Sequence, residues 1–349
     1  MKLKRRKNKN IIIKKYNYGL GILKAILAFY VVRTHCFNYS TLKNKILRYL
    51  IRERKSHVPS FFIMSFYFMH KDLLSSNIKI YLKRIERLLI PYILWPIIIL
   101  LLNNYILYKY IKLQKYPLNI LKSQYLICFG IMRIFWFHWT LIILTTIFFF
   151  IICQYKNKSL FLIQIFGCFA YYMQYSGYNS KFNDYLKPEN RLTIGLFFVS
   201  APFASTGFTL ASFKILDIIP NYKIQTLFFC LFIFCSLDKY SIIEKLKVEN
   251  IYAGLLYNVR AICLIFIFSS FPSNKMTNKN LEKLIKYITN YTAGVYFLHQ
   301  KIYIYCKNII TPIKNGTLFG ICIIYLICYL ICFIGTLIFG KTKLKHLFS

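Results

Sequence analysis

Long uncharged stretches restrict the fold of this chain more than any other feature. Residues 88–108 and 317–340 carry no charge on any face, so neither can form the surface helix of a soluble domain, which needs a polar face. A transmembrane helix takes about 20 such residues, whereas a transmembrane β-strand takes about 10 with alternating polarity. The sequence therefore predicts an all-α, polytopic membrane protein.

Similar apolar segments recur along the 349 residues. We expect about ten transmembrane helices, at residues 18–38, 58–74, 88–108, 134–154, 159–178, 192–213, 222–237, 252–271, 286–307 and 317–339. Hydrophobic residues make up 57% of the chain, more than the roughly 45–50% of a soluble domain. No polar stretch between these segments is long enough to hold a core of its own.

Basic residues dominate both ends of the chain. Residues 1–17 and 340–349 contain lysines but no acidic residue. The positive-inside rule places such tails in the cytoplasm, and an even number of spans keeps both tails on the same side. We therefore expect one membrane domain, residues 18–339, between two basic cytoplasmic tails.

The formal net charge of +37 would favour nucleic acid as the partner of a soluble chain. Here lysine is abundant together with Phe, Tyr, Ile and Asn, which all have A/T-rich codons. Base composition explains this excess, so no nucleic-acid partner is expected, whereas anionic lipid headgroups and anionic ligands suit the basic side.

The 11 cysteines form no CxxC pair and lie mostly in apolar runs, so we interpret them as small core residues. The motifs of P-loop enzymes, zinc proteases and serine hydrolases are missing from the sequence, and no metal is expected.

The first expected span contains three ionisable residues, which are costly inside a bilayer and therefore suggest function. Lys24 and His35 are 11 residues apart, which places them on one helix face about 16 Å from each other. A histidine of near-neutral pKa can take a proton from a hydroxyl group. Arg33 points away from this face and is expected to reach the headgroups. Without a catalytic role, His35 would be a hydrogen-bonded histidine of the bundle and Lys24 an anchor at the cytoplasmic end.

A cationic turn precedes the third expected span. Lys83, Arg84 and Arg87 are spaced three and four residues apart, so a helix gathers them on one side. Guanidinium groups bind phosphate with two hydrogen bonds, as the phosphates of coenzyme A would require. The alternative is a membrane anchor that contacts lipid headgroups.

Six segments, taken in order, resemble acyltransferase family 3, whose members are membrane proteins that move acyl groups onto cell-surface sugars and lipids. The first resembles the family's opening helix, with a basic residue before Ala-Ile and a Val-Val-x-x-His after it, and the third resembles its Arg-x-x-Arg motif followed by Pro-Tyr. The segments are residues 23–35, 58–68, 83–92, 135–137, 202–207 and 291–299.

This resemblance implies a function and a site. It makes His35 the catalytic histidine, Lys24 the counterpart of an arginine in the first helix, and Arg84 and Arg87 the contacts to the acyl donor. It implies transfer of an acyl group, acetyl foremost, from acyl-CoA to a hydroxyl of a cell-surface or lipid-linked glycan, in the plasma membrane rather than an internal one. Lys24 departs from the family pattern, as does Phe66, which stands where the family has glycine after Ser65.

Two other classes of function fit the same residues. A transporter or flippase of a lipid-linked or anionic solute would use Lys24, His35 and Arg260 to line its pathway. A scaffold protein would pair its buried ions with one another, but the chain has only 10 acidic residues for 47 basic ones.

Overall fold

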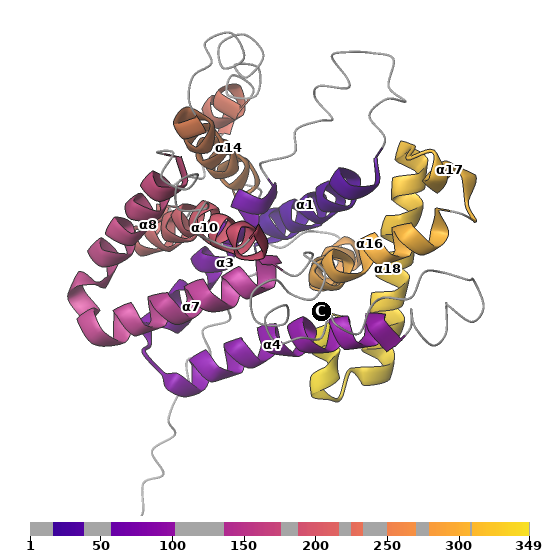
Figure 1. Ribbon diagram of the computed structural model, residues 1–349, viewed down its shortest axis with the longest axis horizontal. Coiled ribbons are helices and arrows are strands. Elements are labelled where there is room, and N and C mark those ends of the chain that lie inside the picture. Colours follow the sequence, from indigo (N-terminus) through magenta and orange to yellow (C-terminus); the bar gives the residue numbers. More distant parts are fainter. Residues whose placement is uncertain are drawn as a thin grey trace, which may run out of the picture.

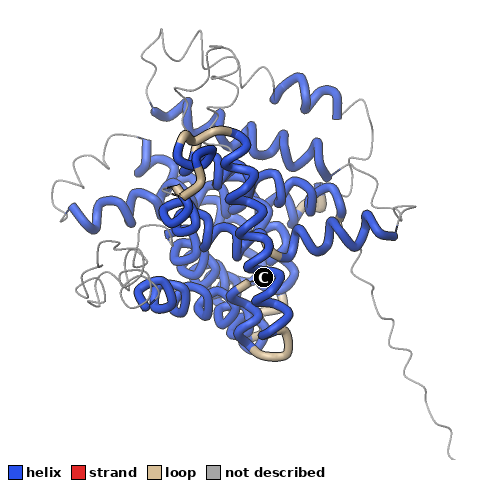
Figure 2. Tube along the Cα trace, turned by 90° about the vertical axis from the view of Figure 1, so that its right-hand side faces the viewer, coloured by secondary structure: helices blue, strands red, loops and turns tan. Residues whose placement is uncertain are grey.

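The computed structural model describes residues 17–37, 57–101, 136–175, 188–215, 225–232, 250–269, 279–307 and 309–348. These residues form helices, turns and short loops, and none of them lies in a strand (Figure 2). The all-α prediction is confirmed for this part of the chain. The first tail up to residue 16 and most of the expected loops lie outside the described residues.

The helices follow one another along the chain with short connections where these are described. They are α1 (Tyr18–Cys36), α3 (His57–Leu74), α4 (Ile78–Leu101), α7 (Trp136–Tyr155), η4 (Lys156–Lys158), α8 (Ser159–Tyr175), α10 (Pro188–Ser212), α14 (Asn250–Ser269), α15 (Lys279–Asn290), α16 (Thr292–Cys306), α17 (Thr311–Lys314), α18 (Leu318–Phe339) and η6 (Lys343–Leu347).

Three described helical stretches are long and apolar enough to cross a membrane: Tyr18–Cys36, Trp136–Gln174 and Leu318–Phe339. The outer face of α18 is lined by large exposed hydrophobic residues, among them Leu326, Leu330 and Leu337. Such a face is unfavourable in water and suits hydrocarbon, so the chain is an integral membrane protein. The count of ten spans stays a prediction.

Local sequence accounts for several helix boundaries. Asn17 caps α1, because its side-chain oxygen accepts a hydrogen bond from the backbone N–H of Leu20 at 3.0 Å. Thr317 caps α18 in the same way, on the N–H of Gly320 at 3.1 Å. α4 continues through Pro91 and Pro96, as transmembrane helices often do. It begins ten residues before the expected span and so includes the whole cationic turn.

The ninth expected span, 286–307, is divided in the structure. α15 ends at Asn290 and α16 begins at Thr292. α15 is amphipathic, with Ile285 buried and Lys279 exposed. It is therefore a surface helix of the bundle and not part of an apolar span.

α1 lies at the centre of the bundle (Figure 1). It packs against α3 and α14 on one side and against α15, α16 and α18 on the other. α3 also packs tightly on α10, which in turn packs on α8. Because the first helix contacts the last ones, residues from both ends of the chain meet around α1.

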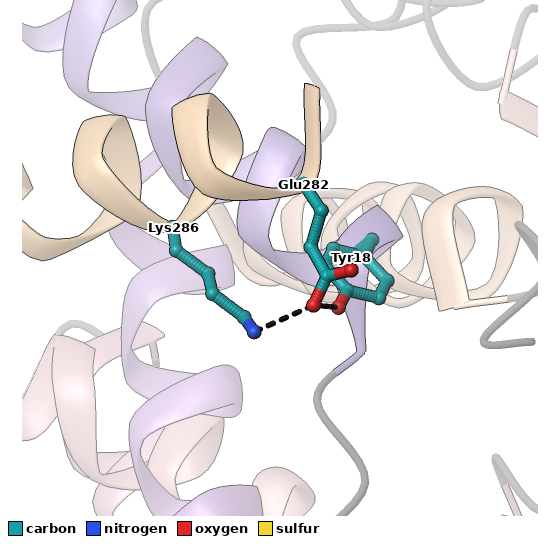
Figure 3. A network of polar contacts seen from close by, with 3 residues as sticks. All are labelled: Tyr18, Glu282 and Lys286. Carbon is teal, nitrogen blue, oxygen red and sulfur yellow. Dashed lines mark hydrogen bonds and ion pairs between the residues drawn. The ribbon is translucent and has the colours of Figure 1, made fainter. Parts of the chain in front are cut away.

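A polar network joins the start of α1 to α15 (Figure 3). The hydroxyl of Tyr18 donates a hydrogen bond to the carboxylate of Glu282, and Lys286 pairs with the same carboxylate oxygen at 2.7 Å. The ammonium group of Lys286 also lies 5.8 Å from the centroid of the Tyr18 ring. These contacts fix the position of α15 against the central helix.

Close approach between α3 and α10 depends on Gly207. A Cβ atom at this position would lie 2.2 Å from the carbonyl oxygen of Ile63, so any other residue would force the helices apart. Phe66, the departure from the family pattern, is fully buried with its ring centroid 4.7 Å from that of Phe148. The bundle therefore accommodates Phe66, and the close approach of α3 to α10 is made at Ile63 and Gly207 instead.

The segment after α18 folds back onto the bundle. Phe348 sits against two glycines: a Cβ at Gly335 would lie 2.4 Å from its ring, and one at Gly294 would lie 2.9 Å from its carbonyl oxygen. Its ring stacks on Phe339 at a centroid distance of 5.9 Å. Trp95 of α4 donates a hydrogen bond from Nε1 to the carbonyl oxygen of Leu347 at 2.9 Å. Residues 343–348 thus connect α4 with α16 and α18.

Candidate active site

α1 carries ionisable side chains toward both of its ends. Lys24 is half-buried in its second turn, and His35 is exposed next to its last residue. The helical rise separates them by about 16 Å. Buried Leu23 and Leu27 hold the first end of α1 in the core. The candidate site therefore has two ends, one near Lys24 and one near His35, whose separation is set by α1.

Cations gather at the first end. Arg84 of α4 lies within electrostatic range of Lys24, and Arg87 and Asp72 lie within range of Arg84. The Nε atom of Arg84 is buried and makes no hydrogen bond among the described residues. We call Lys24, Arg84 and Arg87 the cationic end. Two carboxylates, those of Asp72 and Glu86, lie near these three cations, so the cationic end has excess positive charge that suits a phosphate.

The segment after α18 adds charge beside this end. Lys343 forms an ion pair with Glu86 of α4, and this hydrogen bond holds the pKa of the Glu86 carboxyl below its usual range. Burial, and then the neighbouring charge of Arg87, lower the pKa of His346. His346 is therefore neutral at pH 7 and does not add to the repulsion among the cations.

Aromatic and polar rings gather at the second end. The ring centroids of His35 and His299 are 5.2 Å apart. The side-chain amide nitrogen of Gln300 lies 3.0 Å from Nδ1 of His35. His57, at the start of α3, is buried and lies within electrostatic range of His35. We call His35, His57, His299 and Gln300 the histidine end.

His299 is held firmly by its own helix. Its Nδ1 atom lies 2.8 Å from the carbonyl oxygen of Tyr296 and 3.2 Å from that of Val295. Because both partners are acceptors, Nδ1 carries the hydrogen and donates it. Its Nε2 atom is buried and makes no hydrogen bond among the described residues.

Two segments that resemble the family meet behind the histidine end. The ring of Phe137 lies 5.6 Å from that of Tyr296, and the ring of His138 lies 4.2 Å from that of Phe297. Phe62 of α3 packs on Phe137 at 4.6 Å. Segments distant in the sequence thus form one aromatic wall.

The structure brings together some of the sequence-predicted site residues and separates others. Lys24 and Arg84 come together, whereas His35 lies about 16 Å from Lys24 along α1. Arg33 is buried, with its guanidinium carbon 4.4 Å from the centroid of the Tyr30 ring. The expectation that it reaches the headgroups was wrong, because the bundle buries its side chain. Arg260, considered for a transport pathway, is buried on α14.

Sequence reasoning missed His57 and Gln300. Gln300 is a polar residue inside an expected span and follows a histidine of the family-like motif, which was a usable signal. Among the described residues, no group of three His, Cys, Asp or Glu side chains is placed to hold a metal ion.

Comparison with known proteins identifies the family of the chain. A family model described as an acyltransferase domain matches residues 17–337, which is nearly the whole chain. No curated protein matches the chain, and no solved structure does. The matched range includes every residue of the cationic end and of the histidine end.

Proposed function

The chain belongs to acyltransferase family 3 and is a membrane acyltransferase, and we propose that it moves an acyl group, acetyl foremost, from acyl-CoA to a hydroxyl of a cell-surface or lipid-linked glycan. The observation that supports this proposal best is the division of the site along α1. A cluster of cations lies at one end of the helix and a group of histidines at the other. This spacing suits a donor that carries phosphates at one end and a reactive thioester at the other.

In this proposal the cationic end binds the donor. Arg84 and Arg87 contact the phosphates of coenzyme A, and Lys24 lies next to Arg84 on the path toward the histidines. The roughly 16 Å between Lys24 and His35 accommodates an extended pantetheine arm. The donor would enter from the cytoplasmic side, which is where both tails are expected.

His35 acts as the general base. It takes the proton of the acceptor hydroxyl while the hydroxyl oxygen attacks the thioester carbonyl. A C–O bond forms, the C–S bond breaks, and the coenzyme A thiolate leaves and takes up a proton. The exposure of His35 supports this role, because an acceptor must reach it, while buried His299 cannot be reached in the same way.

The test is transfer of radiolabelled acetyl from acetyl-CoA to an endogenous glycan fraction by membranes that contain the protein. Wild type should transfer label, and His35→Ala should not. Arg84→Ala/Arg87→Ala should raise the KM for acetyl-CoA. His70→Gln and Lys158→Ala are matched controls, since His70 bonds Ser212 at 2.8 Å elsewhere in the bundle and Lys158 is exposed on η4.

Equal transfer by wild type and His35→Ala would refute the role of His35. Absence of transfer by a well-expressed wild type, together with movement of an unmodified solute across the membrane, would favour the transporter or flippase instead.

A further inference from the structure

The contact between Gln300 and His35 joins residues 265 positions apart in the sequence. Gln300 is on α16, which packs directly against α1. It is half-buried, directly follows His299, and is not one of the residues that carry the resemblance to the family. Its side-chain nitrogen lies at hydrogen-bonding distance, 3.0 Å, from Nδ1 of His35.

A neutral imidazole has one N–H and one bare nitrogen, so its neighbours decide which nitrogen can accept a proton. His35 can use Nε2 as a base only when the hydrogen sits on Nδ1. The oxygen and the nitrogen of an amide exchange places by a half-turn at nearly the same positions. In the structure the amide nitrogen faces Nδ1; after the half-turn the amide oxygen takes its place, accepts the Nδ1 hydrogen and leaves Nε2 free.

Charged and titratable side chains approach His35 from α1, α3 and α16. Arg33 precedes it on α1, His57 faces it from α3, and His299 faces it from α16. Arg33 can only donate hydrogen bonds, whereas His57 and His299 each have a ring nitrogen that makes no hydrogen bond among the described residues. The side chain of Gln300 lies at hydrogen-bonding distance from Nδ1 of His35, and its amide oxygen can hold a ring N–H.

We propose that Gln300 is a positioning residue, whose side-chain amide holds His35 in the tautomer that accepts a proton at Nε2. The inference rests on the proposed function, because it needs His35 to act as the base. The amide plays the part of the carboxylate that orients histidine in other hydrolases and transferases.

Kinetics provide the first test. Gln300→Leu removes the amide at similar size and should lower kcat by about 10- to 100-fold, with little change in the KM for acetyl-CoA. Gln300→Glu should retain most of kcat and move the acidic limb of the pH–rate profile to higher pH, since a carboxylate stabilises the imidazolium form. A residue with only a packing role would leave this limb in place.

Gln164 is the matched control. It is also a glutamine within the bundle, and its amide donates to the carbonyl oxygen of Ser205 at 3.1 Å, between α8 and α10. Gln164→Leu should leave kcat per folded protein and the pH profile unchanged. Wild-type kcat in Gln300→Leu, with His35→Ala inactive, would overturn the inference alone; transfer by His35→Ala would overturn the proposed function.

A second measurement does not depend on activity. Nitrogen NMR of the histidine-labelled protein in detergent distinguishes the two tautomers, and the spectrum of His35→Ala identifies the signals of His35. The wild type should carry the hydrogen on Nδ1, and Gln300→Leu should move it to Nε2. The same tautomer in both proteins would overturn the inference, even if no transfer were observed.

Discussion

The rings of His35 and His299 lie 5.2 Å apart between centroids, with their planes inclined by 42°, and one ring is exposed while the other is fully buried. Two histidines in contact therefore have different tasks. The buried ring has its Nδ1 hydrogen directed to backbone carbonyls and presents its other edge to the exposed ring. It supports His35 mainly by filling the space beside it.

Substitution of His299 should separate packing from polarity. His299→Leu should retain most of the stability and transfer activity, since the Nε2 atom makes no hydrogen bond in the described part of the chain and a buried unpaired nitrogen is costly. His299→Ala should lose about 2–4 kcal/mol of stability, as large-to-small changes in cores do, and most of the activity. Thermal unfolding in detergent and the transfer assay measure both. Equal inactivity of the two variants would point to a polar role for His299.

Replacement of Lys24 by arginine should improve donor binding. A guanidinium group makes two parallel hydrogen bonds to a phosphate, which a single ammonium group cannot. Lys24→Arg should lower the KM for acetyl-CoA by about tenfold, equivalent to about 1.4 kcal/mol, and Lys24→Met should raise it. Lys158→Arg, at an exposed site, serves as the control. If both Lys24 variants keep the wild-type KM, the cationic end does not bind the donor.

The network of Tyr18, Glu282 and Lys286 should make stability depend on pH. Hydrogen bonds from Lys286 and then Tyr18 hold the pKa of the Glu282 carboxyl below its usual range. A carboxyl with a lowered folded-state pKa stabilises the fold above its unfolded pKa of about 4.3. This contribution is lost as the pH falls through the folded-state value. Glu282→Gln should therefore lower the melting temperature at pH 7, and its difference from wild type should shrink as the pH falls from about 4.3 through the folded-state pKa.

The exposed residue Lys283 on the same helix provides the comparison. Lys283→Gln should leave the melting temperature near that of wild type throughout the pH range. A difference between wild type and Glu282→Gln that stays constant as the pH falls well below about 4.3 would contradict the assignment.

The contact between Gly335 and Phe348 predicts a coupled pair of substitutions. Gly335→Ala places a methyl group against the Phe348 ring and should cost about 1–3 kcal/mol, the usual range for overpacking. In a Phe348→Leu background the same change should cost much less, since the smaller side chain can give way. A double-mutant cycle from unfolding curves measures the coupling. Additive costs would show that Phe348 does not restrict this glycine.

The length of the uncharged segments predicted the bounds of two helices well. α1 and α18 lie within two residues of the expected bounds, 18–38 and 317–339. The break at Tyr291 was not predicted, because residues 286–307 are apolar enough to read as one span. The amphipathic α15 packs against α1, a tertiary contact that hydropathy does not record.

The sequence predicted which residues of one helix share a face, but not which helices meet at the candidate site. Helical spacing placed Lys24 and His35 on one face, and the Arg-x-x-Arg turn indicated Arg84 and Arg87. Which helices touch is decided by packing between distant segments, so the approach of Arg84 to Lys24 needed the structure. The same holds for Gln300, because no local pattern links α16 to the end of α1.

The contact between His35 and Gln300 also depends on the order in which the chain is synthesised. α1 leaves the ribosome some 265 residues before its partner on α16. At synthesis rates of about 5–20 residues per second, this interval lasts on the order of tens of seconds. Until α16 arrives, the contact between His35 and Gln300 cannot form, so the histidine end is completed only late in synthesis.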